Sequence, residues 1–140
     1  MNADTRPVAT AMINPAVPAS LAEAILGQSA DAIVYADHEG RIGYWNRAAE
    51  RLFGFTAEQV LGQSLDIMIP EKLREAHWAG YDKAMASGTT VHSGRAMVTK
   101  ALRASGEPIY VEMSFAVVDD PGSGRRGSVA IAREAKPRAR

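Results

Sequence analysis

Side chains alternate between apolar and polar over residues 109–118, and this period of two most constrains the fold. The apolar side chains on one side are Ile109, Val111, Met113, Phe115 and Val117, and Tyr110, Glu112 and Ser114 lie between them. Successive side chains of a β-strand point to opposite faces of its sheet. A strand with one apolar and one polar face is typical of an antiparallel sheet that is buried on one side.

Four more segments are predicted to be strands, and helices separate the second from the third. The predicted strands are residues 32–36, 41–45, 95–103 and 127–132, and the predicted helices are residues 21–26, 47–55, 56–62 and 71–87. A turn with Gly40 at positive φ is expected between the first two strands. This order predicts an α+β fold, in which a five-stranded antiparallel sheet has helices packed over one face.

Residues at the helix ends support these boundaries. Asn46 is a preferred N-cap residue for the helix that follows it. Pro70 suits the first position of the long helix, and Gly88 suits its end. Ser20 and Glu23 have the spacing of a capping box, which predicts that the first short helix begins at Leu21.

The chain has the length of a single domain. It contains 140 residues, within the usual size range of one hydrophobic core. Residues 20–133 are predicted to form that domain. Residues 1–19, with prolines at 7, 15 and 18, are expected to be a flexible arm. Residues 134–140 are expected to be a basic, flexible tail.

Charge and composition exclude several kinds of function. Residues 1–124 carry 10 basic and 15 acidic residues, whereas residues 125–140 carry six basic and one acidic. An acidic body repels phosphates, so no nucleic acid partner is expected. The sequence has neither a secretory signal nor an apolar run of roughly 18 residues, so we expect a cytoplasmic protein without membrane contact. No catalytic or zinc-binding arrangement of residues is present, so no enzyme activity is expected.

Two motifs resemble the PAS family of sensory domains. Residues 40–65, GRIGYWNRAAERLFGFTAEQVLGQSL, resemble the S-box of that family, and residues 101–120, ALRASGEPIYVEMSFAVVDD, resemble its later hairpin. The hairpin departs from the family pattern at Ser105, where aspartate is commoner. The resemblance covers residues 21–133. It implies a sensory or dimerisation module, often with a cofactor between the sheet and the long helix.

The absence of cysteine narrows the cofactors that the resemblance implies. The chain contains no cysteine. Flavin domains of the LOV type form an adduct with a cysteine, and domains like photoactive yellow protein attach their chromophore to one. Haem b, non-covalent flavin, a small carboxylate or no ligand remain.

His77 is the residue that most specifically suggests one of these cofactors. It follows Pro70 by seven residues, which resembles the haem-binding PAS domains of bacterial gas sensors, where this helix carries the proximal histidine. Imidazole is a common axial ligand of haem iron. The resemblance also implies distal groups on the next strand, where Arg95 follows Gly94 and Met97 lies two residues on. His77 and Met97 are therefore the predicted metal ligands, with Arg95 as an alternative distal group.

An apolar wall is needed around a porphyrin. The expected wall residues are Leu73, Met113 and Phe115, together with Ile67, Met68, Leu102 and Ile131. A signal of O2, CO or redox state would then be read at the iron.

Other interpretations of the same residues remain open. His77 and Met97 are also compatible with core packing, with Arg95 in solvent, and a lone helix histidine is more often a packed residue than a ligand. The domain would then be a cofactor-free module, or one with another ligand, for dimerisation and protein–protein interaction. A homodimer is expected in either case. The output would lie in a separate signalling protein or in a domain outside this sequence.

Overall fold

One antiparallel sheet organises the computed structural model, which describes residues 18–90 and 94–136. The elements, in chain order, are α2 (Ala19–Gln28), β1 (Ala32–Ala36), β2 (Ile42–Trp45), α3 (Arg47–Phe53), α4 (Ala57–Val60), η2 (Leu65–Met68), α5 (Glu71–Ser87), β3 (Met97–Leu102), β4 (Pro108–Asp120) and β5 (Arg125–Glu134). The strands lie in the order β2-β1-β5-β4-β3, and every neighbouring pair is antiparallel. The five-stranded antiparallel sheet is therefore confirmed.

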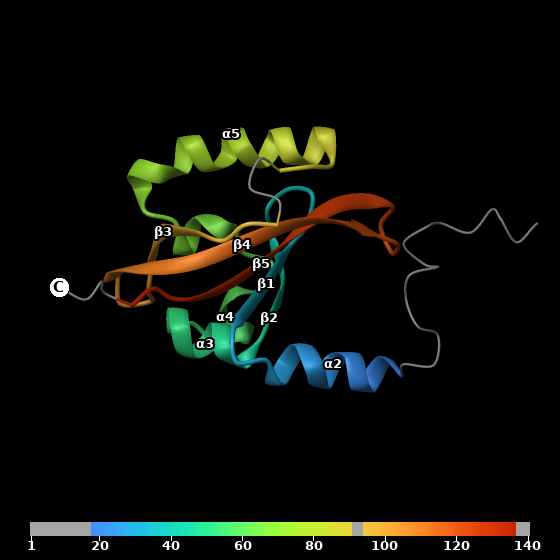
Figure 1. The fold of residues 1–140 in the computed structure, drawn as a ribbon, viewed down its shortest axis with the longest axis horizontal. Coiled ribbons are helices and arrows are strands. Elements are labelled where there is room, and N and C mark those ends of the chain that lie inside the picture. The colour runs from blue at the N-terminus through green and yellow to red at the C-terminus, as the bar shows by residue number, and fades with distance from the viewer. Residues whose placement is uncertain (1–17, 91–93, 137–140) are drawn as a thin grey trace, which may run out of the picture.

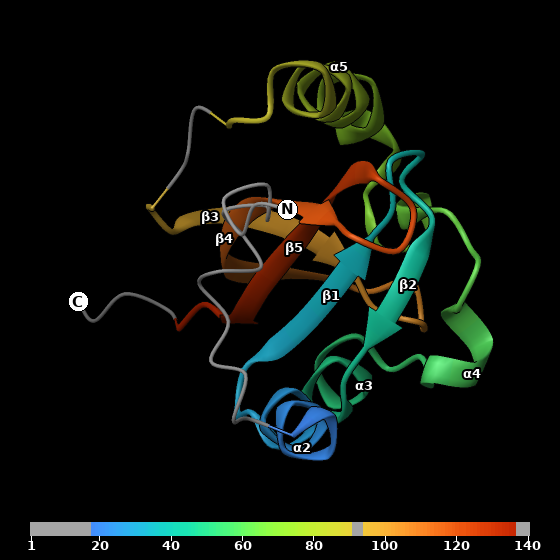
Figure 2. The same ribbon diagram turned by 90° about the vertical axis from the view of Figure 1, so that its right-hand side faces the viewer.

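One face of the sheet shares a single core with four of the helical elements. Val34 of β1 pairs with Ala130 of β5, and Ala130 pairs with Phe115 of β4. Buried residues of α3, α4, η2 and α5 pack against this face, and the helical residues of the core are Ala49, Phe53, Val60, Leu65, Met68, Tyr81 and Met85. The sheet is twisted, and α5 lies at one side of the molecule while α2 and α3 lie at the other (Figures 1 and 2).

Helix α2 is the exception to the prediction that the helices pack over one face. It has no buried residue. Its end lies near the hydroxyl of Tyr44, whose neighbour Trp45 points into the core. The helix also begins at Ala19 after Pro18, without a side-chain cap, and runs to Gln28. The predicted capping box of Ser20 and Glu23 is therefore wrong, because the helix already includes Ser20.

The other predicted helix ends lie within two residues of the observed ones, because α3 ends at Phe53 instead of residue 55 and α4 covers Ala57–Val60 instead of 56–62. Asn46 caps α3 by accepting a hydrogen bond from the Ala49 N–H. Thr56 and Gln59 form a reciprocal capping box on α4. Helix α5 covers residues 71–87 as predicted, and Gly88 ends it with φ at 82°. The short turn η2 was not predicted, because four residues are too few for a visible helical period.

The strands after α5 differ from the prediction in length. β3 begins at Met97, so Arg95 lies before the strand and is exposed. β4 and β5 extend their pairing as far as Asp120 and Arg125, closer to the hairpin turn than predicted. β5 also continues to Glu134, one residue into the segment predicted as tail. The predicted arm lies outside the described residues up to residue 17, and the tail does so from residue 137.

Within residues 18–90 and 94–136, no helix has the length and apolar character needed to cross a membrane.

Candidate functional site

Three aromatic side chains line the side of α5 that faces the core. The rings of His77 and Trp78 have centroids 4.6 Å apart, and those of His77 and Tyr81 are 5.7 Å apart. Tyr81 is 8% exposed, whereas Leu73 is 38% exposed. The side of α5 that packs on the core therefore carries Trp78 and Tyr81, and Leu73, which was predicted to line the porphyrin wall, lies outside it. Trp78 and Tyr81 carry more apolar surface than Leu73 and Gly80, which favours their burial.

Tyr81 connects α5 to two strands of the sheet. Its hydroxyl donates a hydrogen bond of 2.6 Å to the Asp37 carbonyl, and it lies 3.3 Å from the Ala36 carbonyl at the end of β1. The Ser128 hydroxyl of β5 donates a hydrogen bond to the Tyr81 hydroxyl oxygen at 3.2 Å. Burial raises the pKa of Tyr81 to about 12. The phenol is therefore neutral near neutral pH and keeps its proton for the bond to Asp37.

Trp78 connects α5 to η2 and to the turn between β1 and β2. Its indole N–H donates to Asp66 Oδ1 at 2.7 Å. Its ring lies directly against Gly40, and a Cβ on that glycine would overlap the ring. Gly40 has φ of 80°, which confirms the expected positive φ of this turn. Trp78 therefore fits only where residue 40 has no side chain.

Arg126 of β5 caps the other end of α5. Its Nη1 donates to the carbonyls of Met85 and Ala86, both at 2.9 Å. These carbonyls lie in the last turn of the helix, where no intrahelical donor remains. The sequence contains no local signal for this contact, because some forty residues separate the arginine from the helix end.

His77 is half-buried and makes no hydrogen bond in the described part of the chain. Its Nδ1 atom is buried and has no partner. Burial lowers the pKa of His77, and the nearby Asp66 carboxylate partly opposes that shift. The imidazole is therefore neutral near neutral pH, which is the form that ligates metals. A buried polar atom without a partner is uncommon in folded proteins and points to a missing ligand or water.

The stability of the ligand-free domain is expected to fall in mild acid because of His77. The unfolded chain binds a proton on this histidine near pH 6.5, whereas the folded chain binds it only at lower pH. Stability is thus fully present above about pH 6.5 and is lost as the pH falls towards the folded pKa. Urea unfolding from pH 7.5 to 5.5 measures this slope. His77→Gln should reduce the dependence of the unfolding free energy on pH. If this dependence is unchanged in the variant, a group other than His77 causes it.

The sheet face that α5 covers carries Met97, the predicted sulfur ligand, and part of the predicted porphyrin wall. Met97 of β3 pairs with Met113 of β4, so the two share a face. Met113 is 5% exposed and Met97 is half-buried. Phe115 packs against the same core. Met97, Met113 and Phe115 are therefore on the face that α5 covers.

Three other predicted site residues are exposed. Leu73 lies on α5 but is turned towards solvent, and Ile131 is 40% exposed on the opposite sheet face. Ile131 was assigned to the wrong face, because its cross-strand partner is Ser114, which alternates with the buried Met113 and Phe115. Arg95 does not share a strand face with Met97, because it lies outside β3.

Asn46 has no hydrogen-bonding capacity left for a flavin. Its Oδ1 accepts from the N–H groups of Ile33 and Ala49, both at 2.9 Å. Its Nδ2 donates to the carbonyls of Leu26 and Asp31 at 2.9 and 3.1 Å. An asparagine side chain has two donors and two acceptor positions, and all four are in use. The capping role predicted for Asn46 is therefore the observed one, and its link to α2 was not anticipated.

The other two histidines do not add to this site. His38 lies in the turn between β1 and β2, where it is half-buried and its Nδ1 has no hydrogen-bond partner among the described residues. His92 lies outside the described residues. Among residues 18–90 and 94–136, no three His, Cys, Asp or Glu side chains form a metal-binding group.

Comparison with known proteins places this geometry in a family. A family model described as the PAS fold matches residues 20–135. The chain belongs to the PAS family. The PAS domain of a Colwellia psychrerythraea protein superimposes with a TM-score of 0.70 and 21% identity, covering 83% of this chain and 95% of that one. The LOV protein of Rhodobacter sphaeroides gives a TM-score of 0.62 at 18% identity, covering 79% and 62% of the two chains. These likenesses concern the fold alone.

Relatives by sequence include two named sensors. An uncharacterised protein of Azorhizobium caulinodans is 34% identical over 116 residues, which is 82% of this PAS domain's chain and 16% of the relative. The oxygen sensor protein DosP of Escherichia coli is 36% identical over 52 residues, 37% of this chain and 6% of DosP. The sensor protein FixL of Bradyrhizobium diazoefficiens is 40% identical over 53 residues, 38% of this chain and 10% of FixL. The chain thus spans less than a fifth of each relative. It is a sensory PAS domain.

Proposed function

We propose that this PAS domain senses O2, CO or redox state by binding haem b through His77. The observation that carries the proposal is the buried, unpartnered Nδ1 of His77 on the core-facing side of α5. The imidazole packs against Trp78 and Tyr81 but makes no hydrogen bond with the described residues, and burial keeps it neutral. Partial sequence similarity to an oxygen sensor supports the same proposal.

Residues on the facing strands suit the rest of the site. Met97 would offer a thioether to the iron, and thioether ligation raises the haem potential. Met113 and Phe115 supply apolar contact for the porphyrin. Arg95 is the alternative distal group, and we place it second because it is exposed and outside β3. Bound haem would supply an iron centre that takes up a gas or changes oxidation state.

Haem titration of the full chain tests the proposal. We expect a Soret band that saturates at one haem per chain, and His77→Ala should abolish it. His38→Ala is the matched control, since His38 also has a buried, unpartnered Nδ1, and this variant should keep the band. Met97→Leu should keep haem but change the spectrum of its axial ligation. A chain that stays colourless, or an unchanged spectrum in His77→Ala, would overturn the proposal, with circular dichroism to verify folding of each variant.

We also propose that the domain forms a homodimer through α2 and the sheet face that the other helices leave uncovered. The observation in favour is a set of exposed large apolar side chains on these two elements, namely Leu21, Ile25, Leu26, Val98, Tyr110 and Ile131. Single exposed apolar residues are ordinary, but a group of them on one side is typical of interaction surfaces.

Light scattering after gel filtration measures the dimer. We expect a dimer mass for the unmodified chain and a monomer for Ile25→Asp with Ile131→Asp. Leu61→Asp is the control, because Leu61 is 49% exposed on a different part of the molecule. A monomer at all concentrations would contradict the dimer without affecting the haem proposal.

A further inference from the structure

An open hollow lies between α3 and the neighbouring strands β1 and β5. It has a volume of about 260 Å³. Its floor is formed by Ala32, Ala48 and Ala132, which are 2%, 4% and 2% exposed. These positions point into the core, where larger side chains would normally fill the space. The hollow exists because each of the three elements contributes only a methyl group.

Three arginines from distant parts of the sequence surround this floor. Arg51 comes from α3, Arg103 from the turn after β3, and Arg133 from β5, while Glu134 is the only carboxylate in the described lining. The side chains of Arg51 and Arg103 make no hydrogen bond or ion pair with the described residues. The lining residues therefore have a net charge of about +2 near neutral pH, which Asp31, the ion-pair partner of Arg133, reduces to about +1.

Arg133 is held in place by an ion pair. Its Nη2 lies 2.9 Å from Asp31 Oδ2. A guanidinium group has five N–H donors, so this bond leaves most of them available. The pair orients Arg133 without neutralising the other two arginines.

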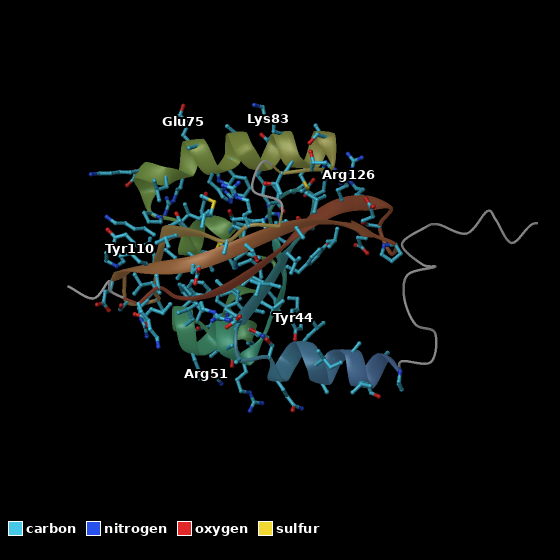
Figure 3. The ribbon with its side chains drawn as sticks, in the orientation of Figure 1. Tyr44, Arg51, Glu75, Lys83, Tyr110 and Arg126 are labelled. Carbon is cyan, nitrogen blue, oxygen red and sulfur yellow. The ribbon has the colours of Figure 1, made fainter. Side chains whose placement is uncertain are left out.

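The hollow is separate from the candidate haem site. Ala32 starts β1, whereas the hydroxyl of Tyr81 reaches the carbonyls of Ala36 and Asp37 at the far end of that strand. Figure 3 shows Arg51 on α3 well away from α5, where Glu75 and Lys83 are labelled. The PAS resemblance implies a cofactor between the long helix and the sheet, and this hollow is not that position.

We propose that the hollow binds a small organic carboxylate whose hydrocarbon part lies on the alanine floor. Guanidinium groups bind carboxylates through paired, charge-assisted hydrogen bonds. The apolar floor favours a ligand with a hydrocarbon body over inorganic phosphate. The volume lies slightly below the usual range for drug-sized ligands, which limits the body to about one ring or a short chain.

Calorimetric titration of the full chain with benzoate tests this site. We expect saturable binding, with benzamide and inorganic phosphate each binding about tenfold more weakly or not at all. Arg51→Gln with Arg103→Gln should weaken benzoate about tenfold or more, while Arg125→Gln, an exposed arginine on the β4–β5 hairpin, should not. Ala30→Leu should also block binding, since Ala30 lines the hollow but is exposed and its replacement leaves the core intact.

Each outcome bears on the proposal. Absence of saturable benzoate binding overturns it. If phosphate binds as tightly as benzoate, the positive charge of the arginines explains the binding by itself, and the role of the alanine floor is overturned. Equal binding of benzamide would overturn the role of the arginines. His77→Ala should bind benzoate unchanged, so failure of the haem proposal and failure of this one are distinguishable.

Discussion

Gly40→Ala is expected to destabilise the domain by about 2–5 kcal/mol, a large part of the stability of a typical domain. Two costs add. Gly40 has φ of 80°, a conformation that L-residues with a side chain rarely adopt. The added Cβ would also overlap the ring of Trp78, which is held on its other side by the bond to Asp66. Urea unfolding followed by circular dichroism measures the loss.

Gly62→Ala is the matched control for this prediction. Gly62 has φ of 85°, and a Cβ there would meet no atom within 4 Å. It should therefore show only the backbone cost of about 1 kcal/mol. If the two variants lose the same stability, the contact between Gly40 and Trp78 contributes nothing and α5 is not held in this way.

Asn46→Ala is expected to lower the free energy of unfolding by about 3–5 kcal/mol. Asn46 is 3% exposed, and its amide bonds four backbone groups from α2, β1, α3 and the connection between α2 and β1. Removing the side chain leaves these groups without partners in a place that water reaches poorly. We also expect faster hydrogen exchange at Ile33 and Ala49, whose N–H groups lose their acceptor.

Two variants separate the parts of this effect. Thr56→Ala removes an exposed cap on α4 and should cost only about 1 kcal/mol, which is the typical value of a cap alone. Asn46→Asp keeps the acceptor oxygen but turns a carboxylate oxygen towards the carbonyls of Leu26 and Asp31. It should be nearly as unstable as Asn46→Ala at pH 7. A loss of about 1 kcal/mol in all three variants would contradict the bridging role of Asn46.

The elements themselves follow from local patterns. The alternation over residues 109–118 predicted both the strand and its buried face, because side-chain direction has a fixed period along a strand. Asn46 and Gly88 marked helix ends because cap residues act on backbone groups within one turn. Pro70 marked the start of α5 as well, although it lies at the N-cap and not at the first helical position that was predicted for it. The order of strands and helices was enough to predict the five-stranded sheet, and the S-box and hairpin motifs were enough to identify the family.

The candidate site was predictable only in part. Strand alternation alone predicted that one face of the sheet carries Met97, Met113 and Phe115. The position of His77 on the long helix predicted that it lies over this face. Leu73 was assigned wrongly, because the helical period gives the width of a face but not its rotation against the sheet. That rotation depends on Tyr81, whose hydrogen-bonding partners are more than forty residues away in the sequence.

The sequence by itself determined the strands, most helix ends, the PAS family and the absence of any cysteine-linked chromophore, because these depend on residue type and on near neighbours. Only the tertiary structure decided how α5 is turned and capped by Arg126, how Asn46 joins three elements, and how Arg51, Arg103 and Arg133 surround one hollow. These contacts join residues far apart in the chain. Their geometry depends on the twist of the sheet and on the packing of the whole core, which no local pattern contains.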